Sequence, residues 1–598
     1  MIAVGVGKFV GLLCVAGVLA HCSGQESLDS AKNAPGAGGG AGAAPCIGAG
    51  CGTGGGTAGT GGVPPEKELE SSFRSPVATG RYVWTANPDS SRVARVDAKS
   101  FDARTFEAGF APTHLVGLPG PSDEDRALVI NVGSYDASLF IADAKGDVTV
   151  HSAGLHQGAN AWAVSASGKW AIAWTNYTQV KNADITEGFQ DVTVLDLSAL
   201  PPVSTRLSVG YRPSRVFIST DDKQAFFVTE PGLSVVTLDS SLGPLVDRDV
   251  PMSDNPLSQP ARDVTVTPDG AYALVRRNGS ADVTLVELAS GTLKNITLSG
   301  AVTDIDLTED GSLAIAVVRA PGDLTGADAG VPDAGSDAGV SADAAGDGMD
   351  GGSDAEGDGM DGGSDDAEAA APDAAPPAPA PDSEMFALPI PGVFSDLGQM
   401  QSQVIGGQVA GSVALGESGN VAVLFTNATA NDHLTLVDLK SGSGFLSYRT
   451  VSLKAPVLAA FVAPDDAHAI ALLQPAAGSS KPGAFSIVPI AKDLPPKIQG
   501  TDAPTFTVSI APAPSTRAIV TTRNDTTKIY ATYVTRMPEL QVDRISLASP
   551  PLASGMVPSA GVAFVAQEHP EGRITFVNLE KGDARTLTGF ELGAKVVD

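Results

Sequence analysis

Short runs of alternating apolar and polar residues dominate the chain from about residue 80 to residue 592. Examples are DVTVLDL (191–197) and HLTLVDLK (433–440), which are also rich in β-branched side chains. A period of two predicts β-strands, and the Asp, Gly, Ser and Pro clusters between the runs predict turns. The longer period of amphipathic helices is missing from these runs. The pattern therefore predicts an all-β fold.

One phrase recurs through this region: a polar turn followed by a small residue, usually Ala, between apolar neighbours. It reads VTPDGAYALV at 266–275 and VAPDDAHAIALL at 462–473. The aligned small residues are Val83, Ala127, Ala171, Ala225, Ala273, Ala314, Ala422, Ala469, Ala518 and Ala563. Their spacings are 44, 44, 54, 48, 41, 108, 47, 49 and 45 residues. Each unit holds three further alternating runs, so we expect four strands per unit.

Four-stranded units with a period of 40–50 residues are typical of β-propeller blades. A single small sheet with two apolar faces cannot bury both faces alone, whereas sheets stacked around an axis cover one another. We expect about ten such units, in residues 66–320 and 384–598. Ten exceeds the usual blade number, so one large ring, two smaller rings and a few incomplete blades all remain open. Two β-sandwich or barrel domains are the alternative fold.

The phrases YVWTAN (82–87), SRVARVD (91–97), TPDGAYALV (267–275) and ADVTLVELASGT (281–292) carry a family resemblance. They resemble the YVTN-type and WD40-like propellers of bacterial surface proteins, over about residues 80–592 outside one insertion. The resemblance implies a propeller fold. It indicates almost nothing about activity, because binding proteins, scaffolds and enzymes all share this fold.

Residues 1–22 have the pattern of an export signal. Lys8 precedes an uncharged apolar run that is too short for a permanent membrane span. The end of the run, LAHCSG, resembles the lipobox of bacterial lipoproteins, although His21 stands where that family has a small residue. The resemblance implies a lipid on Cys22, which becomes the mature N-terminus, and Ser23 favours the outer membrane. Ordinary cleavage and free secretion is the alternative.

Residues 23–65 are expected to form a flexible tether. The segment 33–65 has no charged side chain and 14 of its residues are Gly, so it cannot bury enough apolar area to offset its ordering entropy. Cys46 and Cys51 lie within it. Outside the cytoplasm we expect these two thiols to form a small-loop disulfide, with a metal or redox pair as the alternative.

Residues 321–383 are expected to form an acidic, disordered insertion. From Pro321 to Glu384 there are 14 Asp, 3 Glu and no Lys or Arg, which accounts for 17 of the 30 excess negative charges of the chain. Self-repulsion keeps such a segment extended. Without its 63 residues the 108-residue spacing becomes 45, so the insertion interrupts a loop of one repeat. Calcium capture is an alternative, but the ligand spacing of a calcium loop is missing.

The net charge of −30 argues against a nucleic-acid partner, because phosphates would be repelled. The sequence contains no HExxH motif, no GxSxG elbow before a helix and no phosphate loop in a strand–helix context. We expect the seven histidines at the surface or in turns. No catalytic residue, metal site or cofactor is therefore predicted.

The one local concentration of candidate binding residues is Trp162, Trp170, Trp174 and Tyr177. They precede the longest loop inside the 54-residue unit, and long loops on a propeller face commonly carry binding. Aromatic faces suit sugars or cations. The alternative is that these residues pack between blades.

Together these features favour a non-enzymatic propeller anchored in the cell envelope by an N-terminal lipid. It would present a binding surface to a protein or glycan partner. The first alternative is a propeller-type enzyme, lactonase-like or quinoprotein-like, with a metal-assisted site in the central channel. The second is a structural surface-layer element that assembles with itself.

Overall fold

The computed structural model describes residues 72–592, apart from residues 122, 185, 256–262, 320–381, 441, 492 and 514–515. The predictions for the signal segment and the tether, with Cys22, Cys46 and Cys51, lie outside the described residues. So do all but the last two residues of the acidic insertion.

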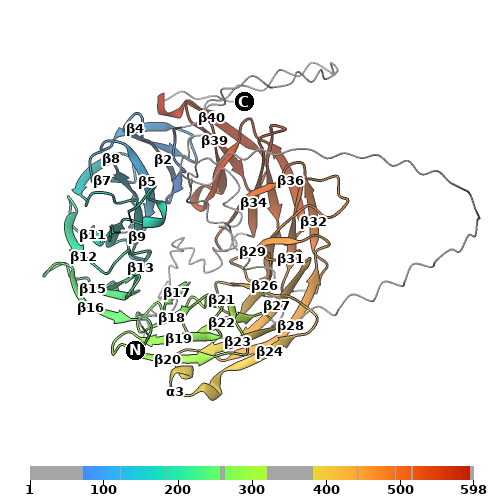
Figure 1. Cartoon of the computed structure of the whole chain (residues 1–598). Coiled ribbons are helices and arrows are strands. Elements are labelled where there is room, and N and C mark those ends of the chain that lie inside the picture. The colour runs from blue at the N-terminus through green and yellow to red at the C-terminus, as the bar shows by residue number, and fades with distance from the viewer. Residues whose placement is uncertain are drawn as a thin grey trace, which may run out of the picture.

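The described chain forms ten four-stranded antiparallel sheets arranged as the blades of one β-propeller ring (Figure 1). Within each blade the four strands follow chain order from the inner strand to the outer strand. The prediction of an all-β propeller with about ten four-stranded units is confirmed. One ring holds all ten blades, so the two-ring arrangement and the sandwich alternative are wrong.

Blades 1 to 5 precede the insertion. Their strands are β1 Val77–Ala78, β2 Tyr82–Asn87, β3 Arg92–Asp97, β4 Ala103–Glu107; β5 Pro112–Leu118, β6 Asp125–Asn131, β7 Asp136–Ala142, β8 Val148–Gly154; β9 Ala161–Val164, β10 Trp170–Trp174, β11 Asp191–Asp196, β12 Val203–Ser208; β13 Arg215–Ile218, β14 Gln224–Val228, β15 Gly232–Thr237, β16 Leu245–Pro251; and β17 Asp263–Val266, β18 Tyr272–Arg276, β19 Asp282–Glu287, β20 Thr292–Thr297.

Blades 6 to 10 complete the ring. Their strands are β21 Val302–Leu307, β22 Leu313–Val318, β23 Ser383–Pro389, β24 Gln401–Ile405; β25 Ser412–Leu415, β26 Val421–Phe425, β27 His433–Lys440, β28 Gly444–Ser452; β29 Val457–Val462, β30 His468–Leu473, β31 Gly483–Pro489, β32 Lys497–Thr501; β33 Thr505–Ile510, β34 Arg517–Asn524, β35 Ile529–Arg536, β36 Gln541–Ser546; and β37 Pro551–Val557, β38 Val562–Gln567, β39 Arg573–Asn578, β40 Ala584–Thr588.

Helical segments are short, and all but the last, which follows the final strand of the described residues, lie between strands. They are η1 Tyr177–Gln179, α3 Gly392–Ser395, η2 Leu397–Gln399, η3 Pro558–Ala560 and η4 Phe590–Leu592. None of the helices in the described part of the chain is long and apolar enough to span a membrane.

The core is divided among the boundaries between blades. The buried apolar side chains of the described residues form ten clusters, and each cluster joins two neighbouring blades. Strand β10 shows how alternation produces this division. Ala171 and Ala173 pack toward blade 2, while Trp170, Ile172 and Trp174 pack toward blade 4. The period of two therefore assigns successive side chains to two different cores.

The recurring small residue lies on the second strand of every blade. All ten members, from Val83 to Ala563, have no exposed surface, and each belongs to the cluster shared with the preceding blade. A small side chain at this place lets larger residues of the preceding blade approach the sheet. The repeat signal in the sequence is therefore a packing signal.

The recurring polar turn connects the first and second strands. In blade 5, Thr267 Oγ1 donates to Asp269 Oδ1 over 2.6 Å and accepts the N–H of Tyr272 over 2.9 Å. Gly270 has φ +71, and a Cβ there would lie 2.7 Å from the ring of Phe226. A left-handed backbone and a close neighbour both require glycine at this position. These Asp and Gly residues shape the turn, as predicted.

The insertion leaves a regular hairpin. Strands β22 and β23 pair in continuous register from Leu313 opposite Pro389 to Val318 opposite Glu384. The insertion therefore interrupts the loop between two paired strands and leaves blade 6 complete, as the spacing predicts. Blade 6 is further bonded to blade 7, because Asp304 Oδ2 accepts the N–H of Val413 over 2.8 Å.

Packing closes the ring between blade 10 and blade 1 (Figure 1). Phe73 meets Phe590 edge-on with ring centroids 5.0 Å apart, and Phe101 meets Phe576 at 5.3 Å. Asn87 Nδ2 donates to Glu591 Oε2 over 2.5 Å. Blade 1 and blade 10 each keep their own four strands, so no strand is exchanged across this seam.

The role of the recurring alanine can be tested in blade 7. Replacing Ala422 by Leu adds three carbons to a site without exposed surface and overpacks the boundary with blade 6. We expect a loss of about 1–3 kcal/mol of stability. Ala428→Leu, in an exposed turn of the same blade, is the control. Equal thermal midpoints for the two variants would contradict the packing role.

Candidate binding face

The topology gives the ring two different faces. The loops between second and third strands and the links between successive blades lie on one face, here called the linker face. The turns that join first to second and third to fourth strands lie on the opposite face. The insertion leaves from the linker face, because it connects β22 to β23. The 16-residue loop from Thr175 to Gln190, between β10 and β11, also lies there.

Two cavities open on the linker face, one at blade 3 and one at blade 5. Their volumes are about 330 and 320 Å³. They occupy equivalent places in the repeat, at the end of the second strand, the start of the third and the link from the preceding blade. The equivalent residues are Thr175 and Arg277, Asp191 and Asp282, and His156 and Ser253.

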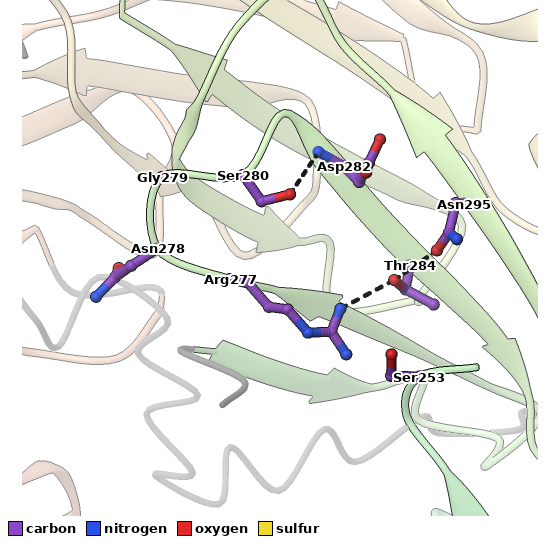
Figure 2. A pocket seen from close by; sticks show the side chains of 8 residues that line it. All are labelled: Ser253, Arg277, Asn278, Gly279, Ser280, Asp282, Thr284 and Asn295. Atoms are coloured by element: carbon purple, nitrogen blue, oxygen red, sulfur yellow. Dashed lines mark hydrogen bonds between the residues drawn. The ribbon is translucent and has the colours of Figure 1, made fainter. Parts of the chain in front are cut away.

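The blade 5 cavity is lined by polar side chains around Arg277 (Figure 2). The guanidinium group donates to Thr284 Oγ1 over 3.1 Å and to the carbonyl of Met252 over 2.6 Å. Thr284 in turn donates to Asn295 Oδ1 over 2.8 Å. Burial lowers the pKa of Arg277 from its usual value, and the Asp282 carboxylate opposes that shift.

The blade 3 cavity is built on His156. This side chain is 3% exposed, and its two ring nitrogens lie 2.9 Å from Thr193 Oγ1 and 3.3 Å from Thr175 Oγ1. Burial lowers the pKa of His156 to about 4, with a smaller opposing contribution from Asp191. The imidazole is therefore neutral at physiological pH. The sequence predicts a surface or turn histidine, and His156 does lie in the link between β8 and β9. Its side chain is nevertheless buried, because the link is hydrogen-bonded to the buried Thr193 hydroxyl.

That hydroxyl belongs to a repeated device that the sequence analysis missed. The third residue of strand β7, β11 or β15 is Ser138, Thr193 or Ser234, and its oxygen accepts a backbone N–H from the incoming link. The donors are Gly109 at 3.2 Å, His156 at 3.0 Å and Gly210 at 2.9 Å. In blade 5 the equivalent Thr284 accepts the Arg277 side chain instead. A Ser or Thr at the third position of the third strand was the available signal.

The wall of the blade 3 cavity is held by Arg212. Its guanidinium group donates to the carbonyls of Glu187 and Asp184 over 3.2 and 3.1 Å. It also lies 5.1 Å from the ring centroids of both Tyr177 and Tyr211. The loop between β10 and β11 is thereby fixed to the link that follows blade 3.

The four predicted ligand-contact residues divide between core and face. Trp170 has no exposed surface and Trp174 is 8% exposed, and both pack between blades 3 and 4. Trp162, on an inner strand, packs between blades 2 and 3 and donates Nε1–H to the carbonyl of His114 over 3.1 Å. The packing alternative thus describes Trp170 and Trp174. Tyr177 lies on the linker face, and ligand contact there remains a prediction.

The described residues contain no group of three or more His, Cys, Asp or Glu side chains placed to hold a metal ion. What the linker face offers is hydrogen-bond donors and acceptors in two preformed hollows. Such hollows can position a polar ligand.

Comparison with known proteins finds similarity only among solved structures. No family model matches the chain, and no curated protein matches it. Among solved structures, the chain is similar to a eukaryotic initiation factor, with 11% identity and a TM-score of 0.45, over 75% of this chain and 92% of that one. It is also similar to the dihydro-heme d1 dehydrogenase NirN, with 12% identity and a TM-score of 0.40, over 78% and 73%.

A third similar structure is the β-propeller domain of Cps50 (Swd1) from Myceliophteria thermophila. Here the identity is 12% and the TM-score 0.31, over 62% of this chain and 96% of that one. The blades themselves define the class, which is a β-propeller of four-stranded sheets. Similarity of fold leaves the activity open.

The buried His156 gives a prediction for pH dependence. The unfolded chain protonates this residue near pH 6.5, whereas the folded protein resists protonation until about pH 4. The contribution of neutral His156 to stability is therefore fully present above pH 6.5. It is lost as the pH falls from 6.5 to about 4, at a cost of up to about 3 kcal/mol. We expect His156→Gln to reduce the fall in thermal midpoint between pH 7 and pH 4.5. An unchanged fall would contradict the assignment.

Proposed function

We propose that this protein is a non-enzymatic β-propeller anchored in the cell envelope, which presents its linker face to a protein or glycan partner. One observation carries the proposal. Both cavities, the long loop pinned by Arg212 and the exit of the acidic insertion lie on the same face of the ring. Loops that a rigid scaffold holds in place are where binding is usually found.

The sequence supports the location. The export signal, the lipobox-like LAHCSG and the glycine-rich segment after it are what a tethered surface protein needs. The first described residue, Ser72, is also on the linker face, because it leads directly into the inner strand of blade 1.

The role of the linker face can be tested by capturing the protein in two orientations. Asn278 is exposed on the linker face of blade 5, and Ala289 is exposed on the opposite face of the same blade. Full-length protein with Asn278→Cys or Ala289→Cys, and with the natural cysteines of the mature chain replaced by Ser, is biotinylated and captured on streptavidin. We expect saturable binding of an envelope component from the source cells only when capture is through residue 289.

Equal binding in both orientations would contradict the assignment of the face. Saturable turnover of a small substrate by the purified protein would contradict the non-enzymatic proposal and favour the propeller-enzyme alternative. Stoichiometric metal in the purified protein, lost together with that turnover on chelation, would favour it further.

The lipid anchor gives a separate prediction. Expressed in a bacterial host with its own signal segment, the chain should incorporate labelled palmitate and partition into detergent. Cys22→Ser should abolish both properties, because the acylated thiol is then missing. Cys46→Ser is the matched control and should keep the label. Equal labelling of the two variants would exclude lipidation at Cys22.

A further inference from the structure

We propose that the blade 3 cavity and the aromatic side chains on its two sides form a binding site for a neutral oligosaccharide chain. This inference rests on the proposed function and gives the linker face a ligand class. The site lies on blades 2 and 3, where packing between blades does not account for exposed aromatic side chains.

The cavity itself presents groups that suit sugar hydroxyls. Its walls include the carboxylate of Asp191, the amides of Gln157 and Gln190 and the hydroxyl of Ser208, with the ring of Phe189 among them. A carboxylate accepts hydrogen bonds and an amide both accepts and donates them, and adjacent hydroxyls of a pyranose ring offer matching donors and acceptors. At about 330 Å³ the cavity is at the lower end of the range for small-molecule sites, a size suited to one or two sugar rings.

One side of the cavity carries an exposed aromatic platform on blade 2. Phe110 is 66% exposed and Tyr135 46% exposed, in a chain whose aromatic content is only 5%. The ring of Phe110 lies over Gly133, where a Cβ would clash with it. Gln157 Nε2 donates to the hydroxyl of Tyr135 over 3.4 Å, so the platform continues directly into the cavity wall.

The other side carries two more tyrosines. Tyr211 lies against Gly188 of the cavity wall, since a Cβ on Gly188 would come within 3.1 Å of its ring. Tyr177 shares the guanidinium group of Arg212 with Tyr211. Along the linker face, the polar cavity therefore lies between two groups of aromatic side chains. Apolar sugar faces stack on aromatic rings while their hydroxyls enter polar hollows, so this order fits a chain of several sugar units.

The platform and the wall are held rigidly before any ligand arrives. Gly133 donates its N–H to the carbonyl of Phe110 over 2.9 Å, and Phe110 donates its N–H to Ser134 Oγ over 2.9 Å. Leu155 donates to the carbonyl of Tyr135 over 2.9 Å. Three separate loops are thereby bonded to one another. Preorganised surfaces lose little entropy on binding.

The charges favour a neutral ligand over an anionic one. The buried His156 is neutral at physiological pH, and Asp191 is an exposed carboxylate. The Arg212 guanidinium at the wall is already engaged by two carbonyls and by Glu230, 3.5 Å away, and the whole chain carries a net charge of −30. An anionic polysaccharide would be repelled. The cavity is lined mainly by polar groups, which suits a small polar ligand.

The test uses affinity electrophoresis of the full-length protein in gels that contain dextran, a mixed-linkage β-glucan or an α-mannan. Polygalacturonate serves as the anionic probe. We expect retardation by at least one neutral polysaccharide and none by polygalacturonate. Tyr135→Ala and Asp191→Ala should each weaken the retardation at least tenfold, because they remove the platform and the cavity carboxylate.

Two matched variants control for general effects. Tyr448→Ala removes a tyrosine of similar exposure, 39%, from the outer strand of blade 7. Asp147→Ala removes an exposed carboxylate from the turn between β7 and β8, on the face of blade 2 opposite the cavity. Both should bind like the wild type, and all four variants should keep thermal midpoints near the wild-type value. A variant that unfolds is replaced by Tyr135→Leu or Asp191→Asn.

No retardation by any neutral polysaccharide would overturn the proposal, and so would retardation that the Tyr135 and Asp191 variants leave unchanged. Retardation by polygalacturonate alone would also overturn it. The proposed function fails differently, when binding is equal in the two capture orientations. Face-dependent binding of a protein, with no retardation in any polysaccharide gel, would keep the proposed function and reject the oligosaccharide.

Discussion

The structure depends on one constraint: each small sheet has two apolar faces, and only a neighbouring sheet can cover each of them. The buried apolar side chains meet this constraint boundary by boundary, as in strand β10, which sends alternate residues into two separate cores. Stability therefore comes from nearest-neighbour interfaces, as in other repeat architectures. The recurring alanine matters because it sets how closely each blade approaches the one before it.

The same constraint assigns packing to the strands and leaves the loops and links free to carry binding residues. Second and third strands are occupied by packing, so variation is confined to the loops and links at the two faces. On the linker face, hydroxyls such as Thr193 accept hydrogen bonds from the links and hold them against the sheet, and Arg212 fixes the loop between β10 and β11. The result is a surface whose side chains differ from blade to blade on an invariant frame. Blades 3 and 5 show this, with His156 and Ser253 at equivalent places in two cavities of similar size.

Much of this fold could be predicted from the sequence, because periodicity of two and the spacing of a small residue are direct consequences of packing. The alignment from Val83 to Ala563 corresponds to ten fully buried positions. The number of rings could not be predicted, since the pitch of stacking depends on small rotations between sheets that spacing does not encode. The candidate site was only partly foreseen. The tryptophans near residue 170 stood out by composition, yet alternation places Trp170 in the core. Phe110 and Tyr135 are isolated in sequence, and only the folded chain brings Tyr135 into contact with Gln157 of the cavity wall.

The seam between blades 1 and 10 carries a consequence for how the chain could be cut and rejoined. It is made of aromatic packing and a few side-chain bonds, as between Phe73 and Phe590, with no strand shared across it. In this respect it resembles the nine other boundaries. The position of the chain ends along the ring should therefore have little effect on the stability of the folded protein. A circular permutant opened at another link would form the same ten interfaces. Evolution by duplication of single blades would face little topological penalty, and the unusually large ring is one that such growth can reach.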